Sequence, residues 1–322
     1  MRRYVAGRVL QSLIVVFLVT TISFVLMHLA PGDPFSFISD FGMSPQLRAQ
    51  LRHQFGYDRP ILEQFARYLG NVAVGRLGFS HSMHRYVGAV IADALPRTLL
   101  LMSVSLVLAF AIGIAVGALQ AVKRDTWLDR ALSCILLLFY SIPDFWLALM
   151  ALLAFGYWVP IFPIGGMSDP ITHDYMSLGG RIADIAVHLV LPAATLSLLT
   201  AAGIARYQRA ALMDVLPQDF VRTARAKGVA ERTVIVRHAL RNALLPVITL
   251  VGLALPAVVG GAFFIEKVFA WPGMGYLAWN AMLSRDYDLV TGIVIVGGIM
   301  VSAGSLIADL LYAVVDPRLR TR

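Results

Sequence analysis

The sequence predicts an all-α integral membrane protein with six transmembrane helices and a small helical extracytoplasmic insertion after the first helix. Composition and long apolar runs predict this class. Of the 322 residues 58% are hydrophobic and 14% are charged, and the mean hydropathy is +0.74, whereas a soluble domain carries about a quarter charged residues. Six runs are long enough to cross about 30 Å of hydrocarbon. Lipid offers no partner to open backbone groups, so each run is expected to be helical.

A long polar segment follows the first run, and shorter polar connections separate the later runs. The first begins behind an Arg-rich N-terminus and is about 22 residues long, which exceeds the apolar region of a cleaved signal peptide. We therefore expect it to remain as a span, so that residues 1–30 form the N-terminal tip and the first helix. The six expected spans are residues 9–30, 95–122, 131–159, 186–205, 243–265 and 289–315.

Residues 31–94 have the character of a soluble subdomain inserted outside the membrane. Ser44 and Pro45 are typical of an N-cap and a first helical residue, and Asp58 with Pro60 predicts the start of a second helix. This subdomain either caps the membrane domain or presents a surface to an extracytoplasmic partner, and both roles can hold. The expected apolar stripes are Leu47, Leu51 and Phe55, then Ile61 or Leu62, Phe65, Tyr68 or Leu69, and Val72.

The basic residues predict the orientation. The two termini and the connections after the second and fourth runs hold 17 of the 27 Lys and Arg residues. Cytoplasmic connections are enriched in Lys and Arg, so both termini are expected in the cytoplasm. The same distribution accounts for the net charge of +8 without a nucleic-acid partner, because the charge follows the topology.

Asp144 is an ionisable residue within the third expected span. Such groups are costly in hydrocarbon and usually face a cavity or a partner, which favours a pathway residue. The segment Ser141-Ile142-Pro143-Asp144 also fits a helix that stops and restarts, with Ser141 as the cap and Asp144 answering the freed N–H groups. Both interpretations stay open at this point.

The connection between the fourth and fifth spans, residues 206–242, is the most informative segment. It holds eight Lys and Arg against three acidic residues, too many charges for a bilayer. Residues 219–226 favour a helix, Gly228 stops it, and residues 231–245 favour a second helix that leads into the fifth span. A helix joined in this way to spans on both sides can transmit a push, whereas a helix that only rests on anionic lipid needs no such break.

This connection resembles the "EAA" coupling motif of permease subunits in ATP-binding-cassette (ABC) importers, Glu-Ala-Ala, three residues, Gly. Here Arg222-Thr223-Ala224 stands in place of Glu-Ala-Ala, and Gly228 is at the motif's glycine. The replacement of Glu by Arg is typical of the peptide and nickel branch. The order of further motifs resembles the B-type permease of that branch over nearly the whole chain. These are Pro31-Gly32-Asp33-Pro34, Asp58-Arg59-Pro60-Ile61, Gly75 to Ser80, Ser141-Ile142-Pro143, Asp219 to Pro246, Glu266 to Gly275 and Asp316-Pro317-Arg318.

The resemblance implies a type I ABC importer permease fold in a bacterial inner membrane, with residues 95–322 as the transmembrane core. It also implies the partners: a second homologous permease, two ATP-binding subunits and an extracytoplasmic binding protein that delivers a peptide. The chain itself is expected to bind no cofactor or metal, and ATP and Mg²⁺ are expected in the partner subunits. The residues expected to contact an ATP-binding subunit are Asp219, Arg222, Thr223, Ala224, Ala226, Lys227, Gly228 and Glu231.

Residues 266–275 follow the fifth expected span on the outer side. Phe269 and Trp271 are either aromatics at the lipid interface or, with Glu266, part of an outer gate or a docking surface. We expect no catalysis by this chain, because its sequence lacks a glycine-rich phosphate loop and a catalytic cluster. A secondary transporter is the other class considered, but the spans offer little besides Asp144 as a coupling carboxylate. Peptide is the default substrate, with a nickel chelate, glutathione, a sugar or another small solute as alternatives.

Overall fold

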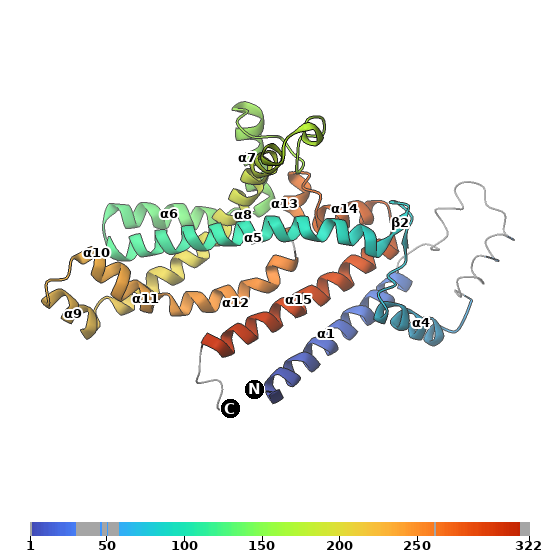
Figure 1. Cartoon of the computed structure of the whole chain (residues 1–322), viewed down its shortest axis with the longest axis horizontal. Helices are drawn as coiled ribbons and strands as arrows, with labels where there is room; N and C mark the ends of the chain where they lie inside the picture. Colours follow the sequence, from blue (N-terminus) through green and yellow to red (C-terminus); the bar gives the residue numbers. More distant parts are fainter. Residues whose placement is uncertain (1, 30–45, 47–49, 51–57, 261, 316–322) are drawn as a thin grey trace. The chain divides into compact units, whose positions relative to one another are not determined.

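The computed structural model describes residues 2–29, 46, 50, 58–260 and 262–315. The chain is helical along most of this part, as the composition predicts (Figure 1). It divides into two compact units, one made of residues 1–94 and 277–302, the other of residues 95–276 and 303–322. The first helix predicted in the insertion, which would begin at Ser44, lies outside the described residues.

The helices and strands follow each other in a simple order. In the first half these are α1 (Arg2–Leu29), α4 (Ile61–Ala73), β1 (Phe79–Ser80), β2 (Arg85–Tyr86), α5 (Val87–Val122), α6 (Trp127–Ser141), α7 (Asp144–Leu152), the π-helical η1 (Leu153–Trp158) and the 3₁₀ turn η2 (His173–Tyr175). In the second half they are α8 (Leu178–Val215), α9 (Asp219–Ala226), α10 (Glu231–Thr233), the π-helical η3 (Val234–Ala239), α11 (Leu240–Ala243), α12 (Leu245–Gly260), α13 (Phe263–Val268), α14 (Met274–Leu283) and α15 (Tyr287–Val315).

Four of the six predicted spans are present as single long helices. Among the described residues four helices are long and apolar enough to cross a membrane, in α1, α5, α8 and α15. Two bent pairs, α6 with α7 and η1, and α10 to α11 with α12, raise the number to six if each pair counts as one span. The third expected span differs most from a straight helix, because it bends by 104° between Ser141 and Asp144. Pro143 explains the break, since its ring cannot continue a helix from the preceding turn.

In the first unit, α4 packs on α1 through aromatic rings. Phe24 of α1 is buried and its ring lies 5.1 Å from that of Phe65 and 5.4 Å from that of Tyr68. Both partners belong to the apolar stripe that the sequence predicts for this helix, and α4 spans the predicted residues. The prediction of the second insertion helix is therefore confirmed.

The two-stranded hairpin β1–β2, which the sequence pattern did not predict, is fixed to the start of α15. Asp286 accepts hydrogen bonds at Oδ2 from the hydroxyls of Ser80 and Ser82, both at 2.7 Å. Its Oδ1 accepts from the N–H of Leu289 at 3.1 Å, as an N-cap does. Gly78 has φ of +94°, and a Cβ there would lie 2.8 Å from Oδ2 of Asp288, so a glycine is required.

In the second unit, α5 and α8 run in the same direction in close contact. A Cβ on Gly113 would lie 2.7 Å from the Ile204 side chain, and one on Gly117 would lie 2.4 Å from the carbonyl oxygen of Ala205. The four-residue step on both helices keeps their contact in register. α6 packs beside α8, and Figure 1 shows α9 to α11 at the end of the unit where α5 and α8 finish.

Candidate functional site

The candidate site is the turn formed by α9 and the residues up to α11, which we call the α9 turn. α9 covers Asp219–Ala226, the residues that the sequence predicts. Gly228 follows with φ of +75°, its N–H donates to the carbonyl of Arg225 at 2.9 Å, and the N–H of Val229 donates to that of Ala224 at 3.3 Å. This pair of bonds is a Schellman motif, which satisfies the last carbonyls of a helix and needs a left-handed residue. The predicted stop at Gly228 is confirmed.

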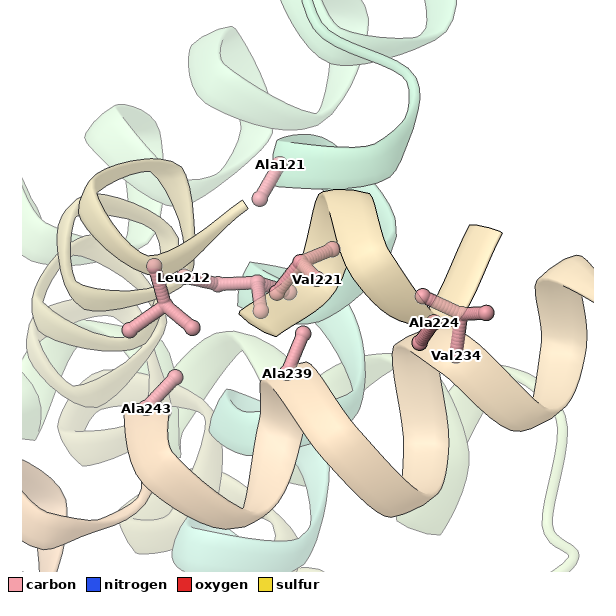
Figure 2. Packing of buried hydrophobic residues seen from close by; sticks show 8 residues of the cluster. Ala121, Leu212, Val221, Ala224, Val234, Ala239 and Ala243 are labelled. Atoms are coloured by element: carbon pink, nitrogen blue, oxygen red, sulfur yellow. The ribbon is translucent and has the colours of Figure 1, made fainter. Parts of the chain in front are cut away.

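One face of α9 is buried against the ends of α5 and α8. Val221 is fully buried and Ala224 nearly so, in a cluster with Val234 and Ala239 of η3 and with Leu212 of α8 (Figure 2). Burying a valine stabilises a fold by about 1.5–3 kcal/mol. The small side chains at Ala224, Ala239 and Ala243 allow the backbones to approach. The turn is thus fixed to two spans rather than suspended from them.

The opposite face of α9 is exposed and charged. Asp219 and Arg222 lie one turn apart with a 3.9 Å separation between charged atoms. Phe220 is 38% exposed, which places an aromatic ring among these charges. The remaining exposed residues of this surface are Thr223, Arg225, Ala226, Lys227, Gly228 and Glu231. We call this set, with Asp219, Phe220 and Arg222, the α9 surface.

An ion pair closes the turn across Gly228. Arg225 donates from Nη2 to Oε1 of Glu231 at 2.7 Å and from Nε to Oε2 at 3.1 Å. This hydrogen bonding raises the pKa of the Arg225 guanidinium and lowers the pKa of the Glu231 carboxyl below its usual value. A bidentate contact between a guanidinium and a carboxylate fixes the relative orientation of the two groups. The end of α9 and the start of α10 are therefore held at a set angle.

The sequence is similar to the sequences of known proteins along nearly its whole length. Residues 113–321 match the family described as "Binding-protein-dependent transport system inner membrane component", and residues 1–102 match the N-terminal part of such components. The chain belongs to this family. It is similar to the oligopeptide transport system permease protein AppB of Bacillus subtilis, with 38% identity over 320 residues and 99% of each chain covered.

Two further relatives agree with this inner membrane component family. A Brucella suis biovar 1 protein whose name includes the words "peptide permease protein" is 43% identical over 325 residues, with 99% of each chain covered. The dipeptide transport system permease protein DppB of Escherichia coli K12 is 35% identical over 319 residues, 94% of each chain. The chain is accordingly a multi-pass membrane permease subunit of an ABC importer, with a non-catalytic role. The resemblance and the fold class predicted from the sequence are confirmed.

In this inner membrane component the coupling residues predicted from the motif come together in one turn. Seven of the eight lie on the α9 surface, and Ala224 is the exception because it faces the buried cluster. Phe220 was not among the predicted residues, because its exposure depends on which face of α9 is buried. The stretch from residue 206 to Val215 continues α8 as helix, so the irregular part of the connection begins later than predicted. Among the described residues no group of three potential ligands could hold a metal ion.

Asp144 is the first residue of α7, directly after the 104° bend. The predicted helix restart is confirmed, but the predicted cap is wrong. Ser141 is the last residue of α6 and its hydroxyl donates back to the carbonyl of Leu137 at 2.8 Å, while Pro143 occupies the N-cap position. Asp144 is exposed and its Oδ1 accepts from the N–H of Phe145 at 2.8 Å. Its role in the pathway stays a prediction.

Glu266 is fully buried and caps α14 from a distance. Its Oε1 accepts from the hydroxyl of Thr98 at 2.7 Å, and its Oε2 accepts from the N–H groups of Gly275 at 2.7 Å and Tyr276 at 3.1 Å. A helix leaves its first N–H groups without partners, and a carboxylate there satisfies them. Burial raises the pKa of Glu266 above its usual value, although these hydrogen bonds oppose the rise.

Trp271 is also fully buried and packs against Leu101, Leu189 and Ala193. Its Nε1–H donates to the carbonyl of Arg97 at 3.0 Å. Phe269 is buried as well, so the alternative that placed these two aromatics at the lipid interface is wrong. The reason is that Trp271 packs against residues of α5 and α8, whereas Phe269 lies in a buried cluster with Ala148 of α7 and Leu191 of α8. A gate role for Glu266 and Trp271 stays a prediction.

Proposed function

We propose that this chain pairs with a second homologous permease to form the pathway for peptides, which an extracytoplasmic binding protein delivers. Two ATP-binding subunits, with ATP and Mg²⁺ bound in them, would supply the energy from the cytoplasmic side, where both termini of this chain lie. The names of the relatives support peptide as the substrate class, because transport systems for peptides, oligopeptides and dipeptides recur among them. A nickel chelate or glutathione would use the same machinery.

The single observation that carries this proposal is the construction of the α9 turn. Its charged surface projects outward, while its underside is buried against the ends of α5 and α8. A partner that moves α9 therefore moves these spans, because close-packed side chains transmit displacement rather than absorb it. The excess of basic residues fits an acidic or polar groove in the ATP-binding subunit.

In the proposed cycle, ATP binding brings the two ATP-binding subunits together. One of them pushes on the α9 surface of this chain, and the other pushes on the corresponding surface of the second permease. The α9 surface then shifts with α8, and the pathway changes from one side of the membrane to the other. A ligand shifts such an equilibrium only by its differential affinity for the two states. Binding of ATP and of the loaded binding protein would have to favour the outward-open state by several kcal/mol to convert most of the population.

Purification of this chain with its partner subunits and reconstitution in liposomes would test the proposal. We expect ATP hydrolysis to rise when binding protein and a short peptide are added together, and peptide uptake to depend on ATP. Copurification without an ATP-binding subunit, or uptake that needs an ion gradient instead of ATP, would contradict the proposal and favour a secondary transporter. ATP-dependent uptake of a nickel chelate but no peptide would keep the mechanism and replace the substrate.

A further inference from the structure

A buried carboxylate joins α6 to α8 close to the α9 turn. Arg209 of α8 donates from Nη2 to Oδ2 of Asp129 at 2.8 Å and from Nε to Oδ1 at 3.1 Å. The Asp129 side chain is 5% exposed, and that of Arg209 is 31% exposed. The N–H of Asp125 donates to the same Oδ2 at 3.1 Å. Both carboxylate oxygens therefore have donors, and the bidentate contact fixes the orientation of the two side chains.

The connection between α5 and α6 is built around this carboxylate. Thr126 is the N-cap of α6, and its hydroxyl accepts from the N–H of Asp129 at 3.4 Å. Gln120, near the end of α5, is buried and donates from Nε2 to the hydroxyl of Ser133 at 2.9 Å. The first turns of α6 are thus bonded to α5 as well as to α8. A displacement of the Asp129 carboxylate would therefore move this end of α6, because close-packed groups transmit displacement.

The α8 end of the ion pair is continuous with the cluster beneath the α9 turn. Leu212 follows Arg209 by three residues in the unbroken helix α8, so it lies about one turn further along. It is fully buried in the cluster that contains Val221 and Ala224 of α9 and Ala121 of α5 (Figure 2). A displacement of the α9 turn therefore reaches the guanidinium within one turn of helix.

Further from the α9 turn, α6 and α8 also meet through apolar side chains. Leu136 of α6 is buried in a cluster with Ala202 and Ala205 of α8. Helices packed through such side chains can slide past one another by small amounts, whereas a bidentate ion pair is directional. Apolar residues of similar volume would stabilise the contact between Asp129 and Arg209 about as well, and the best-attested use of a buried charge pair is to fix register. The ion pair therefore fixes the register of α6 on α8 where apolar packing does not.

We propose that the Arg209–Asp129 ion pair is a positioning element that transmits movement of the α9 turn to α6, and thereby to the third span. α6 ends directly before the 104° bend, and α7 begins after it. Movement of α6 would be passed to α7, which itself contacts α8 and α13. This inference rests on the proposed function, and it adds a third span to the two whose ends the buried face of α9 contacts.

The test uses the reconstituted transporter with all its partner subunits and its binding protein. The amount of peptide transported per ATP hydrolysed is measured in wild type, Arg209→Gln and Asp129→Asn. We expect each variant to lower this ratio about fivefold, which is within the range by which residues on a packed route change the coupling between two sites. Arg209→Lys keeps the charge but not the two parallel hydrogen bonds, so its loss should be intermediate. This variant provides the same comparison if Arg209→Gln does not assemble.

A distance measurement separates transmission of movement from stability. Cys134 is the single cysteine of the chain, and it is exposed on α6. Tyr207 is exposed on α8, so spin labels at Cys134 and at Tyr207→Cys report the distance between the two helices when the partner subunits carry no cysteine. In the otherwise wild-type chain we expect ATP binding to leave this distance unchanged, because α6 moves with α8. In Arg209→Gln we expect ATP binding to change it, because α8 then moves without α6.

Asp286→Asn is the matched control. It alters another buried carboxylate, which lies in the other compact unit and accepts hydrogen bonds from Ser80 and Ser82. Like Asp129→Asn, it should lower the temperature of thermal unfolding. The peptide transported per ATP should nevertheless stay at the wild-type level, because this carboxylate has no contact with the α9 turn.

Three results would overturn the inference. An unchanged ratio of peptide to ATP in both Arg209→Gln and Asp129→Asn would mean that the pair serves only the fold. An equal decrease in Asp286→Asn would mean that any loss of stability lowers the ratio. The same response of the label distance to ATP with and without Arg209→Gln would mean that α6 does not follow α8 through this pair. Absence of peptide uptake by the wild type would instead contradict the proposed function, and the label distances would then decide the inference separately.

Discussion

The α9 turn and the turn around Glu266 both concentrate polar residues, but they use them in opposite ways. In the α9 turn the charges are on the surface, and the buried side chains are small and apolar, as Val221 and Ala224 are. Around Glu266 the carboxylate is buried and every oxygen accepts a hydrogen bond from the same unit. A motif rich in polar residues can therefore either present a surface or hold an interior together, and only burial distinguishes the two.

The largest expected effect comes from removing the buried carboxylate of Glu266. Glu266→Ala removes the acceptor of one hydroxyl and two N–H groups, so we expect the free energy of unfolding to fall by roughly 3–5 kcal/mol, with poor recovery of the protein from membranes. Glu266→Gln keeps one acceptor oxygen and should cost only about 1 kcal/mol. Thermal unfolding of the detergent-solubilised permease measures both. A stable Glu266→Ala protein that fails only in transport would support a gate role instead.

The next effect concerns the stop of α9. Gly228 has φ of +75° but nothing lies within 4 Å of a Cβ placed there, so the cost of a larger residue is backbone strain alone. Gly228→Val should lower stability by about 1–2 kcal/mol and reduce the peptide transported per ATP hydrolysed. Gly228→Asn is the control, because Asn adopts the left-handed conformation more easily. If transport per ATP is unchanged in Gly228→Val, this turn does not couple the two processes.

The exposed face of α9 gives the sharpest contrast with Glu266. Arg222→Glu together with Lys227→Glu changes only exposed side chains, so the free energy of unfolding should stay within about 0.5 kcal/mol of wild type. Copurification of the ATP-binding subunits should nevertheless decrease severalfold, because a positive surface becomes negative. Phe220→Ala is a matched apolar variant that tests whether the ring adds to this interface. Normal copurification in all variants would remove the α9 surface from the proposed interface.

The smallest effect is the pH dependence of the Arg225–Glu231 pair. The pair lowers the pKa of Glu231 in the folded state, so its stabilising contribution is present above the usual pKa of the carboxyl, near 4.5, and is lost as the pH falls through the lowered value. We expect wild type to melt slightly above Glu231→Gln at pH 7. The difference between the two should vanish in acid, and a difference that persists there would assign it to packing.

Local sequence was sufficient for much of the fold. Hydropathy runs long enough to cross the hydrocarbon predicted the six spans, because the bilayer imposes one requirement on every spanning segment. The bounds of α9 followed from a helix-forming stretch and from Gly228, since helix ends are decided by a few adjacent residues. The second insertion helix, beginning after Pro60, followed for the same reason.

The sequence could not predict what each polar residue faces. Thr98 and Glu266 are 168 positions apart in the sequence. Trp271 and Arg97, which are joined by a hydrogen bond, have a similar separation. No local pattern therefore signals that these residues meet. Ser141 illustrates the same limit. It lies before the 104° bend, so its hydroxyl binds a carbonyl of α6 instead of capping α7. The sequence alone therefore determined the class, the spans and the position of the α9 turn. Tertiary structure decided which charges are buried, paired or exposed, because burial depends on neighbours that packing brings from distant parts of the chain.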